Sequence, residues 1–304
     1  MAKKSNANPK ITRALQFAVL AVFILAAVLI TFLSKQDKPQ NHTTALTPDA
    51  TVCSVHFIDV GQADCSLLVC GADTVLIDAG EVDSYPTVHA YLQQQNVTEI
   101  DYFILTHAHA DHIGSADEIL KNYKVNNVIM PKYSDVNMPT SKTYEDLLYA
   151  LSDADAKVIA AVPGNSYTLS ACSFTVLAPH KDYEELNNSS VVVRFAFGDT
   201  AFLFQGDAER KSEQDILDAG FTVRADVIKL GHHGSKTSSS AGYLAAVQPK
   251  LAVVSCGLDN AYNHPSDTIL KRLDDLGIDY RRTDRNGTIV VTSNGTEISV
   301  ETET

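Results

Sequence analysis

The sequence predicts an α/β domain in which two β-sheets pack face to face with helices on their outer sides. Strand-like and helix-like stretches alternate along most of the 304 residues, which is typical of this fold class. The alternation occurs in two halves, and each half opens with consecutive strand-like segments. A content of 45% apolar and 20% charged residues suits a packed core and excludes a disordered acidic chain, a collagen-like polymer and a repeat polymer.

The first half begins with apolar, β-branched segments separated by turns such as Gly71-Ala72-Asp73. Pro86 marks the start of its first helix, since proline is tolerated in the first helical turn. We expect strands at 52–60, 66–70, 74–78, 102–105, 128–129, 157–160, 167–169 and 173–177, and helices at 86–95, 115–121 and 144–151.

The second half opens with a hairpin that turns at Gly198-Asp199 and closes with one that turns at Ser293-Asn294-Gly295. Between them, short β-branched runs alternate with amphipathic stretches of helical period. We expect strands at 190–197, 201–204, 226–230, 251–255, 288–291 and 297–300, and helices at 209–217, 241–247 and 267–276.

A segment ahead of this domain has the length and composition of a membrane anchor. Residues 14–33 carry no charge, and a helix of 20 residues rises about 30 Å, the thickness of the hydrocarbon core. The alternative is a cleaved signal peptide, but the apolar run continues to Leu33 without a small-residue cleavage pattern. Four Lys/Arg residues before position 14 place the N-terminus in the cytoplasm and the rest outside.

These features predict a single-pass protein of the plasma membrane. Its parts are a basic cytoplasmic tail (1–13), a transmembrane anchor (14–33), a polar linker (34–50) and an extracellular domain (51–304). Residues 1–38 hold six Lys/Arg and one acid, so the remainder carries 18 basic and 36 acidic residues, a net charge of −18. That balance argues against a protein that holds nucleic acid on a general basic surface.

The five cysteines are an odd number, and none lies in a C-x-x-C pair. One or two disulfides are possible in an outside compartment, but the apolar, strand-like surroundings favour buried thiols.

The most informative segment is Thr106-His107-Ala108-His109-Ala110-Asp111-His112-Ile113-Gly114, directly after a predicted buried strand. Three imidazoles and a carboxylate within six positions can surround a cation, and chance placement of surface histidines explains this density poorly. Further ligand types, Asp207 and the pair His232-His233, also follow predicted strands, where a rigid scaffold presents functional groups.

These motifs together resemble the metallo-β-lactamase fold, and specifically the soluble domain of ComEC-type competence (DNA-uptake) proteins. The matching segments, in order, are 57–64 (FIDVGQAD), 76–80 (LIDAG), 107–114 (HAHADHIG), 187–190 (NNSS), 205–207 (QGD), 232–235 (HHGS), 260–265 (NAYNHP) and 282–284 (RTD). The resemblance implies an αββα sandwich and a hydrolytic site with two divalent metal ions.

The resemblance also implies roles for individual residues. His107 and His109 would hold the first metal, and Asp111, His112 and one of His232 and His233 the second, with Asp207 bridging. We prefer His233 as the ligand, which leaves His232 to contact the substrate or to support a ligand, since neighbours on an extended chain point apart. The residues expected at the reaction itself are Asp111, His232 and His264, the last as a proton donor or phosphate ligand.

The sequence departs from the superfamily pattern at the first metal. Many members supply a further histidine from the segment that here reads Glu185-Leu186-Asn187-Asn188-Ser189-Ser190. The ComEC-like branch shares this pattern, so the departure agrees with the resemblance. The missing histidine leaves the occupancy of the first site open, and His180 is a possible substitute. A site with fewer imidazoles makes Mn²⁺ a rival to Zn²⁺.

Other polar residues are candidates for supporting roles. Asp59 and Asp78 follow strands and could orient the histidine loop, although each could equally be an acid in a turn. Asp64 is a weaker candidate for the same role. Ser235, Lys236, Asn260 and Tyr262 could contact an anionic substrate, the alternative being polar loops.

The function expected from these observations is metal-dependent hydrolysis of phosphodiesters by a hydroxide that two metal ions activate. The substrate would be DNA, as for a nuclease, or a choline-bearing cell-wall polymer. The alternatives are a lactone or β-lactam hydrolase, which the missing histidine disfavours, and a non-catalytic binding module, which the otherwise complete ligand set disfavours. The N-terminal helix implies contact with the membrane, and the sequence indicates no protein partner.

Overall fold

The computed structural model describes residues 52–303. The predicted tail, the anchor at 14–33 and the linker at 34–50 lie outside the described residues. Within residues 52–303, no helix has both the length and the apolar character needed to cross a bilayer.

The first of two sheets has eight strands in the order β15-β14-β1-β2-β3-β4-β5-β6. Strands β3 to β6 are parallel to one another, and the others pair antiparallel. The strands are β1 Cys53–Phe57, β2 Ser66–Cys70, β3 Asp73–Ile77, β4 Glu99–Ile104, β5 Lys124–Met130, β6 Lys157–Ala160, β14 Ile289–Ser293 and β15 Ile298–Thr302.

The second sheet has seven strands in the order β13-β12-β11-β10-β9-β8-β7. Here β10 to β13 are parallel, and β7 to β10 form an antiparallel meander. The strands are β7 Ser166–Thr168, β8 Ser173–Ala178, β9 Val192–Phe197, β10 Thr200–Phe204, β11 Val227–Lys229, β12 Leu251–Val254 and β13 Asp279–Arg282.

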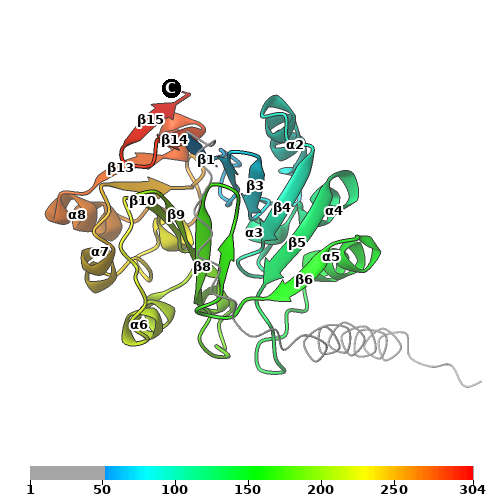
Figure 1. The fold of residues 1–304 in the computed structure, drawn as a ribbon. Helices are drawn as coiled ribbons and strands as arrows, with labels where there is room; N and C mark the ends of the chain where they lie inside the picture. The colour runs from blue at the N-terminus through cyan, green and yellow to red at the C-terminus, as the bar shows by residue number, and fades with distance from the viewer. Residues whose placement is uncertain (1–51, 304) are drawn as a thin grey trace, which may run out of the picture. The chain divides into compact units, whose positions relative to one another are not determined.

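Helices cover the outer side of each sheet, which gives the four layers seen in Figure 1. The first sheet is covered by α2 Tyr85–Gln94, α3 Ala110–Ile113, α4 Ala116–Asn122 and α5 Lys142–Asp153, and the second by α6 Arg210–Asp218, α7 Ala241–Val247 and α8 Asp267–Leu276. Short helices η1 Leu186–Ser189, η2 Gly231–Gly234 and α9 Thr283–Asn286 lie in loops. The predicted αββα sandwich is confirmed.

Three apolar cores separate these layers. The central core lies between the sheets, where the rings of Phe57 on β1 and Phe204 on β10 stack with their centroids 5.8 Å apart. The outer cores lie between each sheet and its helices. In α8, Ile269 and Leu273 are buried four residues apart, on the side that faces the second sheet, as an amphipathic helix requires.

Apart from the short 3-10 helices η1 and η2, the sequence did not predict one strand and one short helix, and it misjudged one loop. Strand β13 was not predicted, because its sequence Asp-Tyr-Arg-Arg is polar and has no apolar run. Helix α9, directly after it, was also missed. The segment after His109, expected as irregular loop, contains the single helical turn α3.

All five cysteines are buried free thiols in the structure, in agreement with the interpretation that the sequence favoured.

We expect Phe204→Ala to destabilise the domain by about 3–5 kcal/mol, because it removes a buried ring from the contact between the sheets. Urea unfolding followed by circular dichroism measures this change. Tyr149→Ala on α5 is the control, since that ring is 48% exposed, and it should change the free energy of unfolding by less than about 0.5 kcal/mol. Equal effects of the two substitutions would contradict the central position of the stack.

Candidate metal centre

The candidate ligands lie where parallel strands of both sheets end. His107 and His109 follow β4, and α3 then presents Asp111 and His112. From the second sheet, Asp207 follows β10, and the loop after β11 carries His233 in η2. Two sheets that meet at these ends bring together groups more than 120 residues apart in sequence.

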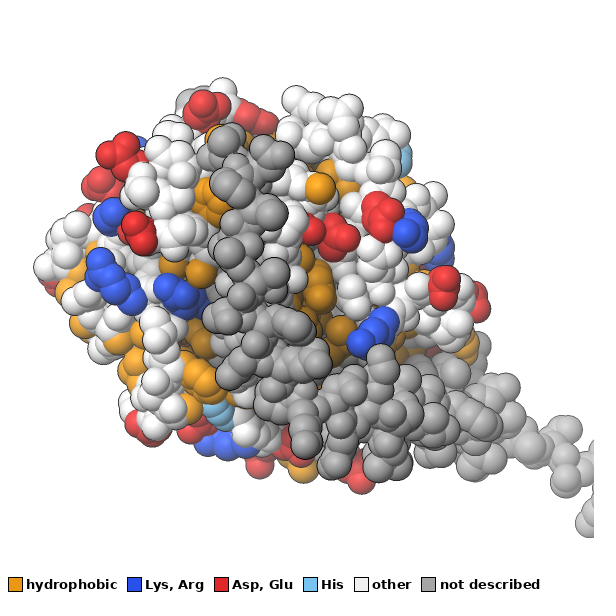
Figure 2. Space-filling model, in the orientation of Figure 1, with side chains coloured by type: hydrophobic (Ala, Val, Ile, Leu, Met, Phe, Trp, Pro, Cys, Tyr) orange, Lys and Arg blue, Asp and Glu red, His pale blue; other side chains and the backbone are white. Residues whose placement is uncertain are grey.

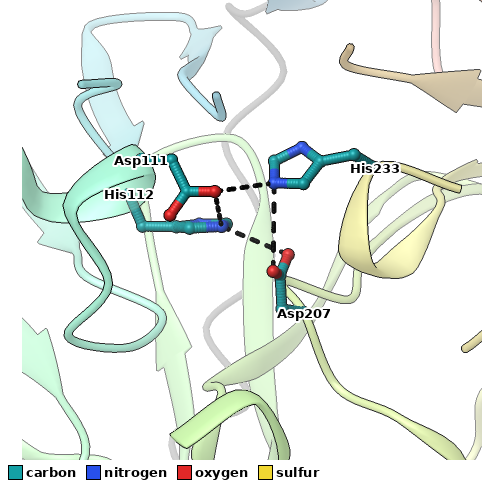
Figure 3. Close-up of side chains that lie close together, drawn as sticks. All are labelled: Asp111, His112, Asp207 and His233. Carbon is teal, nitrogen blue, oxygen red and sulfur yellow. Dashed lines mark hydrogen bonds and ion pairs between the residues drawn. The ribbon is translucent and has the colours of Figure 1, made fainter. Parts of the chain in front are cut away.

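Four of these side chains form one group of potential ligand atoms (Figure 3). Asp111 Oδ2 lies 3.1 Å from His233 Nε2, and His112 Nε2 lies 3.2 Å from Asp207 Oδ1. His233 Nε2 is also 3.8 Å from Asp207 Oδ2. The four donors therefore point at a common centre.

A second group consists of His107, His109 and again Asp207. His107 Nε2 lies 3.9 Å from Asp207 Oδ2 and 2.9 Å from His109 Nδ1. Asp207 thus belongs to both groups, which is the position that the sequence analysis gives to a bridging carboxylate.

The donors in the first-described group fit a divalent cation. His112 Nε2 and Asp207 Oδ1 are buried and have no hydrogen-bond partner of good geometry. Buried polar atoms are normally satisfied, and imidazole and carboxylate are the ligand types of Zn²⁺ and related ions. Two imidazoles and two carboxylates around one point therefore match a metal site better than a structural cluster.

Asp78 supports this group from behind. Its carboxylate accepts hydrogen bonds from the Thr106 amide and hydroxyl, both at 2.8 Å, and lies 2.7 Å from His112 Nδ1. A carboxylate on the far nitrogen fixes the ring so that Nε2 faces the centre.

Asp59, expected in the same role, does not contact the histidine loop. Its Oδ1 accepts from the Gly61 amide at 3.1 Å, so it is an acid in a turn, which was the alternative reading. Strand β1 ends at Phe57, before Asp59, and the chain turns at Gly61 before it reaches Asp64.

The supporting carboxylate in that region is Asp64, which the sequence analysis ranks behind Asp59 and Asp78 for this role. Asp64 lies 3.4 Å from His233 Nδ1 and forms a buried ion pair with Lys229. The signal for this pair was Lys229 itself, a lysine inside an apolar strand, which needs a buried anion as partner.

Electrostatics separate the two groups of ligands. Burial lowers the pKa of His107 well below its ordinary value, and the nearby His112 adds to this effect. Burial opposes the charge of His233 as well, but Asp207 and Asp64 outweigh it and raise its pKa to about 10. The pKa of His112 is likewise raised well above its ordinary value against the effect of burial, chiefly by Asp207 and Asp78.

The carboxylates stay ionised. Burial alone would raise the pKa of Asp207 and of Asp111, but the surrounding imidazoles lower both values below the ordinary range. His107 and His109 are therefore neutral at pH 7, whereas His112 and His233 carry protons until a cation replaces them.

Among residues 52–303, no third histidine joins the group of His107 and His109. The segment that would supply it, η1 and the residue after it, places Ser190 Oγ 3.3 Å from His107 Nδ1. His180 does not substitute, because its ring packs against Phe221, with centroids 5.6 Å apart, away from both ligand groups.

The two neighbouring histidines of η2 lie in different surroundings. His233 is buried and belongs to the four-residue group. His232 is partly exposed; its Nδ1 lies 3.3 Å from Glu209, and its Nε2 lies 3.7 Å from Asp207 Oδ2. Both have positive φ angles, 52° and 51°, so the segment is not extended and their divergence has a different cause from the one assumed in the sequence analysis.

The predicted substrate-binding residues line one pocket of about 650 Å³ beside this centre. They share it with His264, whose ring centroid is 5.5 Å from that of His232. Burial, reinforced by the charges of His232 and His233, lowers the pKa of His264 to about 4. His264 is thus neutral at pH 7 and can offer a hydrogen bond. The predicted residues in this pocket are Ser235, Lys236, Asn260 and Tyr262.

Comparison with known proteins identifies a family that matches this chain and several similar proteins. Residues 58–258 match the family described as the Metallo-beta-lactamase superfamily. ComE operon protein 3 of Bacillus subtilis is 34% identical over 256 residues, which cover 77% of this chain and 32% of that protein. Recombination protein 2 of Haemophilus influenzae is 31% identical over 229 residues, which cover 72% of this chain and 26% of that protein.

The resemblance to ComEC-type competence proteins is confirmed by these relatives, and the chain spans about a third of their length or less. Among solved structures, the metallo-beta-lactamase fold protein YhfI from Bacillus subtilis aligns with a TM-score of 0.56 at 14% identity, covering 80% of this chain and 100% of that one. At this identity the likeness concerns the fold alone.

We expect metal binding to the four-residue group to release protons and to strengthen as the pH rises. The folded-state pKa of His233, about 10, lies above its ordinary value of 6.5. Protonated His233 therefore stabilises the metal-free domain below pH 6.5, and this contribution is lost as the pH rises through 10. Because a cation must displace that proton, affinity should rise up to tenfold per pH unit for each proton released.

Calorimetric titration with Zn²⁺ or Mn²⁺ between pH 6 and 9, in buffers of different ionisation enthalpy, counts these protons. His89→Gln is a control, since His89 contacts Tyr123 and neither ligand group, and it should leave the count unchanged. An affinity independent of pH would contradict the expectation.

Proposed function

The chain belongs to the metallo-beta-lactamase superfamily, and we propose that it is a metal-dependent phosphodiesterase that cleaves DNA strands outside the cell membrane. The observation that carries the proposal is the pair of ligand groups that share Asp207. Two cations held in this way would generate a nucleophile from water near neutral pH and stabilise charge on the attacking and leaving oxygens.

The protein side chains have distinct tasks in this proposal. Asp207 holds the two ligand groups together, and His107 and His109 offer neutral nitrogens without losing a proton. Asp111, partly exposed and ionised, faces the open side of the four-residue group. There it can accept a proton or a hydrogen bond from an incoming water.

The adjoining pocket supplies contacts for the rest of the substrate. Its lining includes the basic residues Lys236, Arg282 and Arg285 together with the acidic residues Asp259, Asp267 and Asp284. The pocket therefore offers a phosphate individual cationic contacts rather than a net positive surface. His264, neutral and half-buried in the same pocket, would donate a hydrogen bond to a phosphate or leaving oxygen.

DNA is the first choice of substrate because the curated relatives are named as competence and recombination proteins. The contact between the domain and DNA would be confined to a small part of the surface. On the face in Figure 2, basic and acidic side chains of the described residues are interspersed and form no continuous basic band. The net charge of −18 after residue 38 is also the reason to keep a second candidate, a phosphoesterase acting on a choline-bearing cell-wall polymer.

The location of this activity rests on the sequence alone. The uncharged segment 14–33 would anchor the chain, and the basic residues before it would keep the N-terminus in the cytoplasm. The domain would then act outside, where DNA arriving at the cell surface is available.

We expect the full-length chain, purified in detergent with Mn²⁺ or Zn²⁺, to hydrolyse bis(p-nitrophenyl) phosphate and linearised plasmid DNA, with little turnover of nitrocefin. Asp207→Ala should lower kcat at least about 100-fold and reduce the bound metal measured by elemental analysis. Asp199→Ala in the β9–β10 turn is the matched control and should retain both. Turnover of nitrocefin alone, or no turnover with unchanged metal content in Asp207→Ala, would contradict the proposal.

Protease added to intact cells tests the topology separately. We expect loss of residues 51–304 from the cell fraction, detected with an antibody against the C-terminus, while a cytoplasmic marker survives. Full protection of the domain in intact cells, with digestion only after lysis, would overturn the outward assignment.

A further inference from the structure

Three of the five cysteines gather in the core between the two sheets. Cys53, Cys70 and Cys172 are each at most 1% exposed and belong to this central core. The other two lie elsewhere, Cys65 in the outer core of the first sheet and Cys256 in that of the second. The odd number of cysteines thus resolves into a cluster of three and two isolated thiols.

The sheet register fixes two of the three opposite each other. Cys53 on β1 pairs directly with Cys70 on antiparallel β2. The Ile58 amide donates to the Cys65 carbonyl at 3.0 Å, and hydrogen-bonded and non-hydrogen-bonded pairs alternate along the ladder. Counting from that pair places Cys53 and Cys70 in a non-hydrogen-bonded pair, where Cα atoms are about 4.5 Å apart. A disulfide accommodates this separation.

The third thiol reaches the same point from the other sheet. Cys172 lies just before β8, in the hairpin where the Leu169 amide donates to its carbonyl at 2.9 Å. The Ser170 amide in the same hairpin donates to Asp73 Oδ2, just after the turn that follows Cys70, at 2.5 Å, and Cys172 shares the central core with Cys53 and Cys70.

We propose that Cys53, Cys70 and Cys172 form a dithiol–disulfide site, in which Cys53 and Cys70 are joined across β1 and β2 and Cys172 is the thiol that can exchange with them. The two thiols lose two protons and two electrons, and an S–S bond forms. The two protons and two electrons are accepted by the disulfide of a thiol–disulfide exchange protein, which leaves as a dithiol. Because the cluster is buried, the bond forms while the β1–β2 hairpin is still exposed during folding.

The disulfide would affect the metal centre through the chain segment that it closes into a loop. The segment between Cys53 and Cys70 contains Asp64, which contacts His233 and pairs with Lys229. A cross-link at the base of this hairpin restricts the unfolded chain and stabilises the fold. Its presence in the cell rests on the proposed outward location, since disulfides persist in oxidising compartments.

The test counts thiols in the full-length chain refolded with a mixture of oxidised and reduced glutathione, then alkylated in denaturant and digested for mass spectrometry. We expect three alkylated cysteines, with peptides of Cys53 and Cys70 joined and Cys65 and Cys256 always alkylated. Reduction should lower Tm by about 5–10 °C. Five alkylated cysteines, or a bridge through Cys65 or Cys256, would overturn the proposal.

Variants make the assignment specific. Cys256→Ser, outside the cluster, should leave the bridge intact, whereas Cys70→Ser should move it to Cys53 and Cys172. Loss of every bridge in Cys70→Ser would refute Cys172 as the exchanging thiol. Protein from cells should carry the same bridge. A bridge that forms on refolding but is missing in cells would support the site and overturn the outward location, so the two failures are distinct.

Discussion

A buried carboxylate, Asp207, lies among four imidazoles, and much of the molecule is arranged around its charge. An ionised carboxylate without partners would be very costly at such a depth. His107, His112, His232 and His233 approach it at 3.9, 3.2, 3.7 and 3.8 Å, and His112 and His233 carry compensating protons. Removing either of these two leaves a charge unbalanced, so the cluster is defined as a unit rather than as separate pairs.

The sheets place that charge, because neither sheet carries the cluster alone. The first sheet delivers the histidine motif after β4, and the second delivers Asp207 and His233 after β10 and β11. Phe204, whose ring stacks on Phe57 across the central core, is three residues before Asp207. The packing that joins the sheets therefore also sets the distance between the two halves of the centre.

Much of this arrangement was predictable from the sequence, and the reasons for the exceptions are physical. Apolar periodicity gave the strands and helices that contact a core, and the dense histidine motif after a strand identified the centre. Strand β13 escaped because pairing at a sheet edge needs no apolar side chains. The role of Asp64 depends on Lys229, 165 residues away, and no local pattern reports such a partner.

The loop of His232 and His233 shows the limit of local rules. Alternation on an extended chain correctly separates neighbouring side chains, but this segment turns with positive φ at both positions. Its shape comes from tertiary contacts, such as the bond from the His232 amide to the Gly206 carbonyl at 3.0 Å. Which of the two rings belongs to the four-residue ligand group is therefore decided by the fold around them.

Because Asp207 belongs to both ligand groups, the stability of the domain would depend on the metal available to it. A cation that binds only the folded domain stabilises it in proportion to the logarithm of its free concentration. The same ion would here hold together strand ends from both sheets and neutralise the buried carboxylate. In metal-poor surroundings the domain would open more often and be degraded sooner by proteases, so the abundance of this protein would itself follow the supply of metal.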